Sequence, residues 1–134
     1  MQQLERTSDS MPNELPPEGP AGFAAGLPAA APVAPPPALS IIIPTFNEVR
    51  NVPILVDRLD KALAGIAWEV IFVDDDSPDG TAEAVRQIAR RDPRVRCLRR
   101  IGRRGLAGAC IEGMLASSAR AVAVMDGDLQ HDEK

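Results

Sequence analysis

The sequence has little of what binds nucleic acids, forms disulfides or spans membranes. Of its 134 residues, none is tyrosine and only four are phenylalanine or tryptophan, which leaves few surfaces on which bases could stack. The two cysteines, Cys97 and Cys110, lack the spacing of a metal or redox motif and lie within apolar patterns. We therefore expect buried thiols in a reducing, cytoplasmic compartment and no nucleic-acid partner.

No segment approaches the roughly 20 uninterrupted apolar residues of a membrane-spanning helix. A glycine-rich phosphate loop is also missing, because Gly102, Gly105 and Gly108 do not follow a strand in the dinucleotide-binding pattern. The net charge of −4 is too small to indicate a partner. These absences argue against a P-loop or dinucleotide-binding protein.

Residues 1–38 differ from the rest of the chain, since they contain nine of the thirteen prolines and many alanines and glycines. Proline removes backbone donors and fixes φ, so we predict a disordered Pro/Ala-rich arm that is partly polyproline II. A secretory signal peptide is disfavoured, because a basic start is missing and prolines interrupt the apolar part.

Residues 39–134 alternate between strand and helix patterns. Apolar, β-branched runs predict strands over 39–43, 68–73, 95–98 and 121–125, the first of them ended by Pro44. Apolar residues at three- and four-residue steps predict helices over about 52–66, 81–91 and 105–118. We expect the first helix to bury residues up to Ile66, Ser77 or Asp79 to cap the second, and the third to bury one apolar face, made of Leu106, Ala109, Cys110, Met114 and Leu115. Such alternation predicts an α/β fold with an open parallel sheet and helices on both faces.

Three of the four predicted strands end in polar motifs, at 44–48, 74–76 and 126–131. Because ligands bind at the carboxyl ends of strands in such sheets, we expect these motifs to gather on one rim. Asp126 and Asp128 form an Asp-x-Asp pair that could hold Mg²⁺ or Mn²⁺ beside a diphosphate. Gln130 could add a carbonyl oxygen, and Arg103 and Arg104 could face a phosphate at the start of the third helix. His131, the only histidine, is more simply read as a solvated residue.

Four segments in order resemble the family 2 glycosyltransferases, and within them most closely the polyprenyl (dolichyl) phosphate mannosyltransferase branch: 42–48 (IIPTFNE), 73–81 (VDDDSPDGT), 104–106 (RGL) and 124–131 (VMDGDLQH). The resemblance covers residues 39–134. It implies a GT-A (Rossmann-like) fold and inverting transfer of a sugar, expected to be mannose from GDP-mannose, to a polyprenyl phosphate. A lipid phosphate is already anionic, so no general base is implied and no catalytic residue is assigned.

The resemblance also implies roles for nine residues. The nucleoside pocket would be lined by Pro44, Phe46 and Glu48, and the base and ribose would meet Val73 and Asp75. Arg104 would approach the diphosphate, and Mg²⁺ or Mn²⁺ would be held by Asp126, Asp128 and Gln130.

Two departures from the family pattern are Gly127, where alanine is usual, and Asp132-Glu133, where prolines often follow. The family continues well past this motif, so we expect residues 39–134 to be the donor-binding half of a truncated domain. On this interpretation the chain binds nucleotide without turnover, its last strand is an uncovered edge, and the missing C-terminal part would carry the acceptor site and any association with the cytoplasmic face of a membrane.

Two other interpretations remain at this stage. In a phosphoreceiver module, Asp74–Asp76 would be the acidic strand end and Asp126 the phosphoacceptor, but the lysine and hydroxyl residues required downstream are missing. A sugar-phosphate nucleotidyltransferase would need a glycine-rich basic loop after the first strand, which the sequence lacks.

Overall fold

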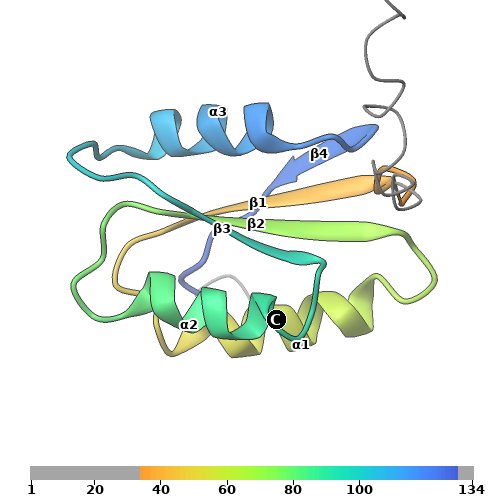
Figure 1. Cartoon of the computed structure of the whole chain (residues 1–134), viewed down its shortest axis with the longest axis horizontal. Helices are drawn as coiled ribbons and strands as arrows, with labels where there is room; N and C mark the ends of the chain where they lie inside the picture. Colours follow the sequence, from red (N-terminus) through yellow and green to blue (C-terminus); the bar gives the residue numbers. More distant parts are fainter. Residues whose placement is uncertain (1–33, 130–134) are drawn as a thin grey trace, which may run out of the picture. The chain divides into compact units, whose positions relative to one another are not determined.

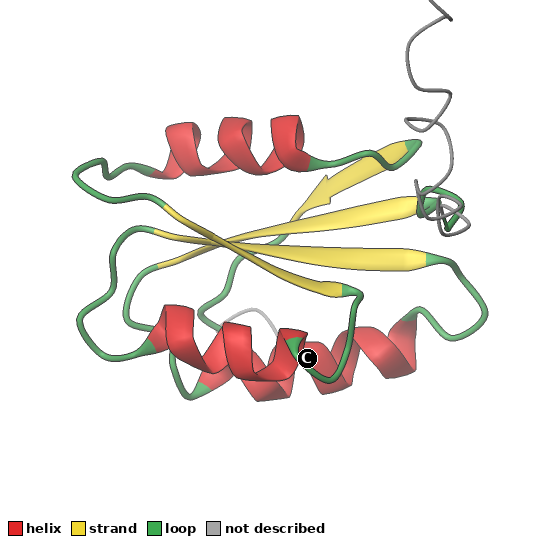
Figure 2. Cartoon of the chain, viewed as in Figure 1, coloured by secondary structure: helices red, strands yellow, loops and turns green. Residues whose placement is uncertain are grey.

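The computed structural model describes residues 34–129, so the predictions for residues 1–33, for Gln130 and for His131 lie outside the described residues. Strands and helices alternate in the order β1 (Leu39–Thr45), α1 (Asn51–Ala62), β2 (Trp68–Asp74), α2 (Thr81–Ala89), β3 (Val95–Arg99), α3 (Leu106–Ala116) and β4 (Ala121–Val124). All strand pairs are parallel. Figures 1 and 2 show α1 and α2 on one face of the sheet and α3 on the other, which confirms the predicted α/β architecture.

The strand order β3-β2-β1-β4 makes β1 the point where the order reverses. The chain builds outward from β1 through β2 to β3, and α3 then carries it back to place β4 on the other side of β1. In open parallel sheets, ligands bind at the carboxyl ends of the strands at such a reversal. The same order excludes the phosphoreceiver interpretation. In a phosphoreceiver, the strand before Asp126 would pair directly with the acidic strand, here β2. In this structure β1 lies between β2 and β4.

Strand β1 continues through Pro44 to Thr45, so the prediction that Pro44 ends the strand is wrong. The amide of Met125 donates to the Ile42 carbonyl and that of Asp75 to the Thr45 carbonyl. Because backbone groups of alternate residues face opposite neighbours, Pro44 faces β4, as Ile42 does. The β1–β4 ladder ends at the pair Ile42–Val124, so the missing N–H of Pro44 costs no ladder bond.

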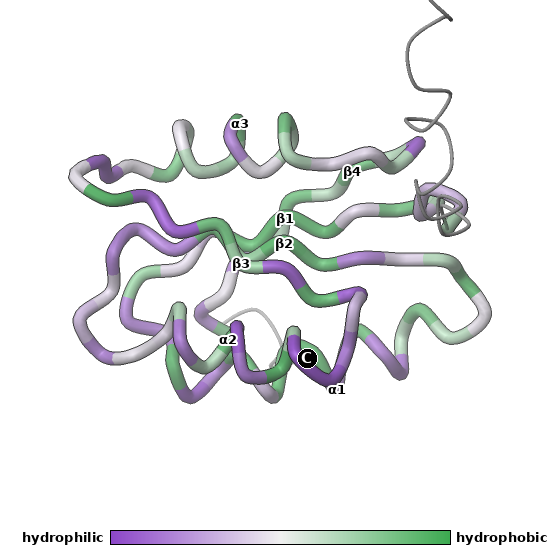
Figure 3. Tube along the Cα trace, in the orientation of Figure 1, coloured by the Kyte–Doolittle hydropathy of each residue, from purple (hydrophilic) through white to green (hydrophobic). Residues whose placement is uncertain are grey.

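Apolar side chains fill both faces of the sheet, and every residue of β2 is buried. Figure 3 shows the most hydrophobic stretches along the central strands. The larger cluster lies toward α1 and α2 and contains Ile41, Ile43, Val52, Leu55, Leu59, Trp68, Val70, Phe72, Val85 and Val95. A smaller cluster lies under α3 and contains Ile42, Ile71, Val73 and Ala109. Ile66 follows α1 and is 48% exposed, which corrects its predicted burial.

Helix α3 packs through small residues, which corrects most of its predicted buried face. Ala109 and Gly113 are buried, whereas Leu106, Met114 and Leu115 are 70%, 43% and 80% exposed. A Cβ atom at Gly113 would lie 2.3 Å from Cγ2 of Ile42, so the helix approaches the sheet more closely than large side chains allow. Cys110 on this helix is half-buried, as is Cys97 on β3, so the expected full burial of both thiols is wrong.

In the part of the chain that the structure describes, strand β4 lies at one edge of the sheet and all four of its residues are exposed. Val122 and Val124 are 41% and 47% exposed. Within residues 34–129, no helix has the length and hydrophobicity to cross a bilayer.

The turn from α2 to β3 contains a charge cluster centred on Arg94. Its guanidinium lies 4.2 Å from the centre of the Trp68 ring and donates to Asp92 and Asp60 at 2.8 Å. These hydrogen bonds from Arg94 hold the pKa of Asp92 below its ordinary value. The resulting stabilisation is therefore present above the pKa of an unfolded aspartate and is lost as the pH falls through the lower, folded value.

We predict that Asp92→Asn makes the free energy of unfolding less dependent on pH below about pH 4. Urea denaturation between pH 2 and pH 6, followed by Trp68 fluorescence, measures this dependence. Asp57→Asn is the control, because Asp57 forms an exposed pair with Lys61, a kind of pair that contributes little to stability. The same slope in Asp92→Asn and the wild type would contradict the prediction.

Candidate functional site

The loop after β1 is held by side chains from the loop after β2 and from the first residue of α2. Three successive backbone N–H groups, those of residues 47, 48 and 49, donate to Ser77 Oγ, Thr81 Oγ1 and Asp79 Oδ2 at 2.9, 3.0 and 3.1 Å. These donors are occupied by protein acceptors, so the two loops form one braced unit. The bracing fixes the positions of Phe46 and Glu48 at the rim of the sheet.

The acidic run at the end of β2 has mostly structural roles. Asp74 is completely buried, and its carboxylate accepts hydrogen bonds from the hydroxyl and amide of Ser77. Gly80 is the N-cap residue of α2 and no side chain caps the helix, so the prediction that Ser77 or Asp79 caps it is wrong. Asp79 instead accepts hydrogen bonds from the amide and hydroxyl of Thr81, the first residue of α2. Asp76 pairs with Arg99, whereas Asp75 contacts the segment between β3 and α3.

Asp75 is anchored from two directions by the segment between β3 and α3. One carboxylate oxygen accepts from Arg100 Nη1 at 2.7 Å and the other from the Gly105 amide at 2.8 Å. Arg100, whose side chain is 4% exposed, also pairs with Glu112 on α3 at 3.2 Å. Asp75 is therefore a fixed carboxylate whose remaining lone pairs can accept hydrogen bonds from a ligand.

Phe46 and Arg104 meet across the rim, with the guanidinium 4.5 Å from the ring centre. Phe46 is 42% exposed, so the pair presents a flat cationic surface to solvent. A cavity of about 340 Å³ lies beside it, lined by Asp76, Gly102, Arg103 and Arg104. Arg103 pairs with Glu112 at 2.8 Å, which leaves Arg104 as the better candidate to meet a phosphate.

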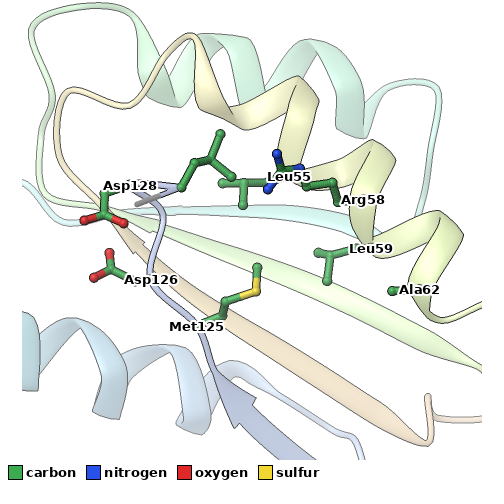
Figure 4. A pocket seen from close by; sticks show the side chains of 8 residues that line it. Leu55, Arg58, Leu59, Ala62, Met125, Asp126 and Asp128 are labelled. Carbon is green, nitrogen blue, oxygen red and sulfur yellow. The ribbon is translucent and has the colours of Figure 1, made fainter. Parts of the chain in front are cut away.

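Asp126 and Asp128 follow β4, and Figure 4 shows their carboxylates close together at one end of the view. Glu48 faces the same place: burial raises the pKa of its carboxyl, and the negative charges of Asp128 and Asp126 raise it further. Asn51, the first residue of α1, donates to the Glu48 carboxylate and to the Gly127 carbonyl. The metal and nucleoside motifs of the sequence therefore lie together.

The oxygen-rich surroundings of Asp126 and Asp128 fit a hard divalent cation, which prefers carboxylates, waters and phosphate oxygens. In the described part of the chain, no group of three or more histidine, cysteine, aspartate or glutamate side chains is arranged to enclose a metal. Two carboxylates without a closed cage suit a cation that takes its other ligands from water and substrate phosphates. The third predicted ligand, Gln130, lies beyond the described residues.

The other predicted residues lie at different depths. Pro44 is half-buried at the end of β1. Val73 is completely buried, and a Cβ atom at Gly113 of α3 would approach its Cγ2 to 2.9 Å. In this structure the Val73 side chain therefore packs beneath the rim, against α3.

An apolar cavity of about 300 Å³ lies between α1 and the chain after β4 (Figure 4). Leu55, Leu59, Met125 and Leu129 contribute its apolar wall, and Asp126 and Asp128 lie at its margin. The turn that carries Asp126 and Asp128 thus lies between the polar rim of the sheet and this apolar cavity.

Sequence reasoning missed two residues that hold the site together, Arg100 and Asn51. Arg100 was one of eight arginines between residues 90 and 104, and nothing in that run marks the one that is buried. Asn51 follows Glu48 at helical spacing, which is a weak signal for a contact between them, but its bond to Gly127 depends on the tertiary fold.

Residues 40–134 match the family model described as glycosyl transferase family 2. A dolichol-phosphate mannosyltransferase of Pyrococcus furiosus is 44% identical over 93 residues, which cover 69% of this chain and 26% of that protein. One of Saccharomyces cerevisiae is 37% identical over 95 residues, covering 69% and 36%. The chain thus spans about a quarter to a third of the length of these relatives.

Among solved structures, a mannosyltransferase from Pyrobaculum calidifontis in complex with GDP-Man and Mn²⁺ is similar in fold. The TM-score is 0.59 and the sequences are 28% identical, over 69% of this chain and 28% of that one. This similarity and the parallel sheet confirm the expected GT-A architecture.

Proposed function

Because the chain belongs to glycosyl transferase family 2, we propose that residues 39–134 form the nucleotide-binding part of a metal-dependent mannosyltransferase site. The proposed donor is GDP-mannose, which the similar Pyrobaculum structure contains together with Mn²⁺. The proposed acceptor is a polyprenyl phosphate, in line with the names of the dolichol-phosphate mannosyltransferase relatives.

The observation that carries this proposal is that two acidic residues follow β4 and an arginine–aromatic pair follows β1, its neighbour at the reversal in strand order. Asp126 and Asp128 lie at the end of β4, and the Phe46–Arg104 pair lies at the ends of β1 and β3. A diphosphate that spans this rim would meet cationic groups at both ends once a divalent ion is held by the two aspartates. Mg²⁺ and Mn²⁺ both fit, with Mn²⁺ supported by the similar structure.

In the proposed site, Pro44, Phe46 and Glu48 line the nucleoside pocket and Asp75 accepts hydrogen bonds from the base or ribose. Arg104 binds the diphosphate, and Gln130 is the proposed third ligand of the cation. The cation would neutralise the charge that develops on the departing diphosphate. An acceptor phosphate is anionic at neutral pH, so the proposed inverting displacement needs no general base from residues 39–134.

We predict that the chain binds GDP in the presence of Mn²⁺ and that Asp128→Ala weakens this binding. Loss of a residue that only hydrogen-bonds to a metal ligand typically weakens metal binding by roughly 10- to 100-fold, so loss of a ligand itself is expected to cost at least as much. Isothermal titration calorimetry with GDP, with Mn²⁺ or with EDTA, measures the effect. Asp57→Ala removes an exposed carboxylate of α1 that pairs with Lys61, and this variant is expected to bind as the wild type does. Equal affinity of the wild type in Mn²⁺ and in EDTA would overturn the metal assignment.

A further inference from the structure

Asn51 joins two parts of the site that are far apart in the chain. Its side-chain nitrogen donates to the Glu48 carboxylate in the loop after β1. It also donates, at 3.1 Å, to the carbonyl of Gly127, 76 residues away. One amide group therefore bridges the turn that carries Asp126 and Asp128 and the loop after β1, residues 46–50, which we call the nucleoside loop.

The Asp126–Asp128 turn is held on its other side by β1. Gly127 is buried, and a Cβ atom there would lie 3.3 Å from Ile43 Cγ2, Thr45 Cγ2 and the Pro44 carbonyl oxygen. Gly127 thus packs so closely against the end of β1 that a larger residue would crowd it. Its carbonyl points to Asn51, so the residue between the two aspartates is fixed from both sides.

The backbone ladder does not extend into this turn. Pairing between β1 and β4 ends at Val124, and the next backbone hydrogen bond is that of the Met125 amide to the Ile42 carbonyl. Beyond it, Asn51 supplies a side-chain donor to the turn at Gly127. An asparagine suits this place because its NH₂ group can donate twice, to a carboxylate and to a carbonyl.

We propose that Asn51 is a positioning residue for the divalent cation. By holding Gly127 against β1, it fixes the two flanking carboxylates before the cation arrives, and by holding Glu48 it ties the metal turn to the nucleoside loop. Preorganised ligands bind a cation more tightly because they lose less conformational freedom on binding. The inference rests on the proposed function, in which Asp126 and Asp128 hold the cation.

The test is Asn51→Ala, compared with the wild type and with Gln87→Ala, which removes an exposed amide from α2. Free Mn²⁺ is titrated by electron paramagnetic resonance in the presence of GDP, and amide hydrogen exchange is measured without metal. We expect about 10-fold or greater weakening of Mn²⁺ binding in Asn51→Ala, together with faster exchange of the amides of residues 127–129 and unchanged exchange in β2. Gln87→Ala is expected to match the wild type in both measurements.

A purely structural role for Asn51 would raise exchange throughout the sheet, and that result would overturn the proposal. So would a wild-type affinity for Mn²⁺ in Asn51→Ala. If the wild type itself fails to bind Mn²⁺ with GDP, the proposed function fails and this inference fails with it. If the wild type binds Mn²⁺ and Asn51→Ala binds it equally well, only the inference about Asn51 fails.

Asn51→Asp is a second variant in case the alanine variant does not fold. It keeps the shape of the side chain and removes both donors, so exchange at residues 127–129 is expected to rise while β2 stays protected. Unchanged protection of these amides in a folded Asn51→Asp variant would contradict the proposal that Asn51 holds the turn at Gly127 in place.

Discussion

Replacing Arg100 by methionine is expected to lower the free energy of unfolding by about 3–5 kcal/mol, the usual cost of removing one partner of a buried ion pair. The Arg100 and Asp75 side chains are 4% and 12% exposed and their charged groups lie 2.7 Å apart. Without Arg100, Asp75 would keep the Gly105 amide but would lose its countercharge. Urea denaturation followed by fluorescence of Trp68, the single tryptophan, measures the loss.

Two variants separate burial from charge in this prediction. Arg103→Met removes another arginine that pairs with Glu112, but its side chain is 62% exposed, so a loss below about 1 kcal/mol is expected. Asp75→Asn combined with Arg100→Met removes both charges of the buried pair and is expected to recover part of the stability. Equal losses of stability in Arg100→Met and Arg103→Met would show that the buried ion pair contributes no more to stability than the exposed one.

Replacing Gly113 by valine is expected to destabilise the fold by about 3 kcal/mol, at the upper end of what overpacking a core costs. In an ordinary helix, replacing glycine by alanine stabilises by about 1 kcal/mol. Here even the first added carbon would lie 2.3 Å from Ile42 Cγ2 and 2.9 Å from Val73 Cγ2, and both residues are completely buried. We therefore expect Gly113→Ala to be destabilising as well, which reverses the usual sign.

A double-mutant cycle with Ile42→Ala tests whether this clash is the cause. Ile42→Ala removes the obstructing Cγ2 and alone costs about 2–5 kcal/mol. Combined with Gly113→Ala, the total loss is expected to be smaller than the sum, because the new methyl group occupies part of the vacated space. Strict additivity of the two losses, measured by urea denaturation, would refute this explanation.

The order of strands and helices was predictable because apolar runs and helical periodicity reflect local requirements. The buried runs at β1 and β2 are strong signals, and the rule that polar strand ends share a rim predicts from the sequence alone that Phe46, Asp75 and Asp126 lie at the same edge. The effect of Pro44 was not predictable, because whether its missing N–H matters depends on which neighbouring strand it faces.

The packing of α3 was not predictable from hydrophobicity. A pattern of large apolar residues pointed to Leu106, Met114 and Leu115, whereas the helix approaches the sheet through Ala109 and Gly113. The distance between helix and sheet selects small residues, and a single sequence does not reveal that distance. In the site, the same limit hid Arg100 and Asn51, whose partners are set by tertiary contacts.

The position of β4 has a consequence for the order in which the chain folds. Strands β1, β2 and β3 pair with neighbours in sequence through α1 and α2, whereas β4 must return across the whole of that unit to pair with β1. Contacts between distant residues carry a larger entropic cost of loop closure and tend to form late. A nascent chain would thus complete the loop after β1 before residue 121 has joined the sheet, and the two aspartates would join this scaffold later than Phe46 and Asp75.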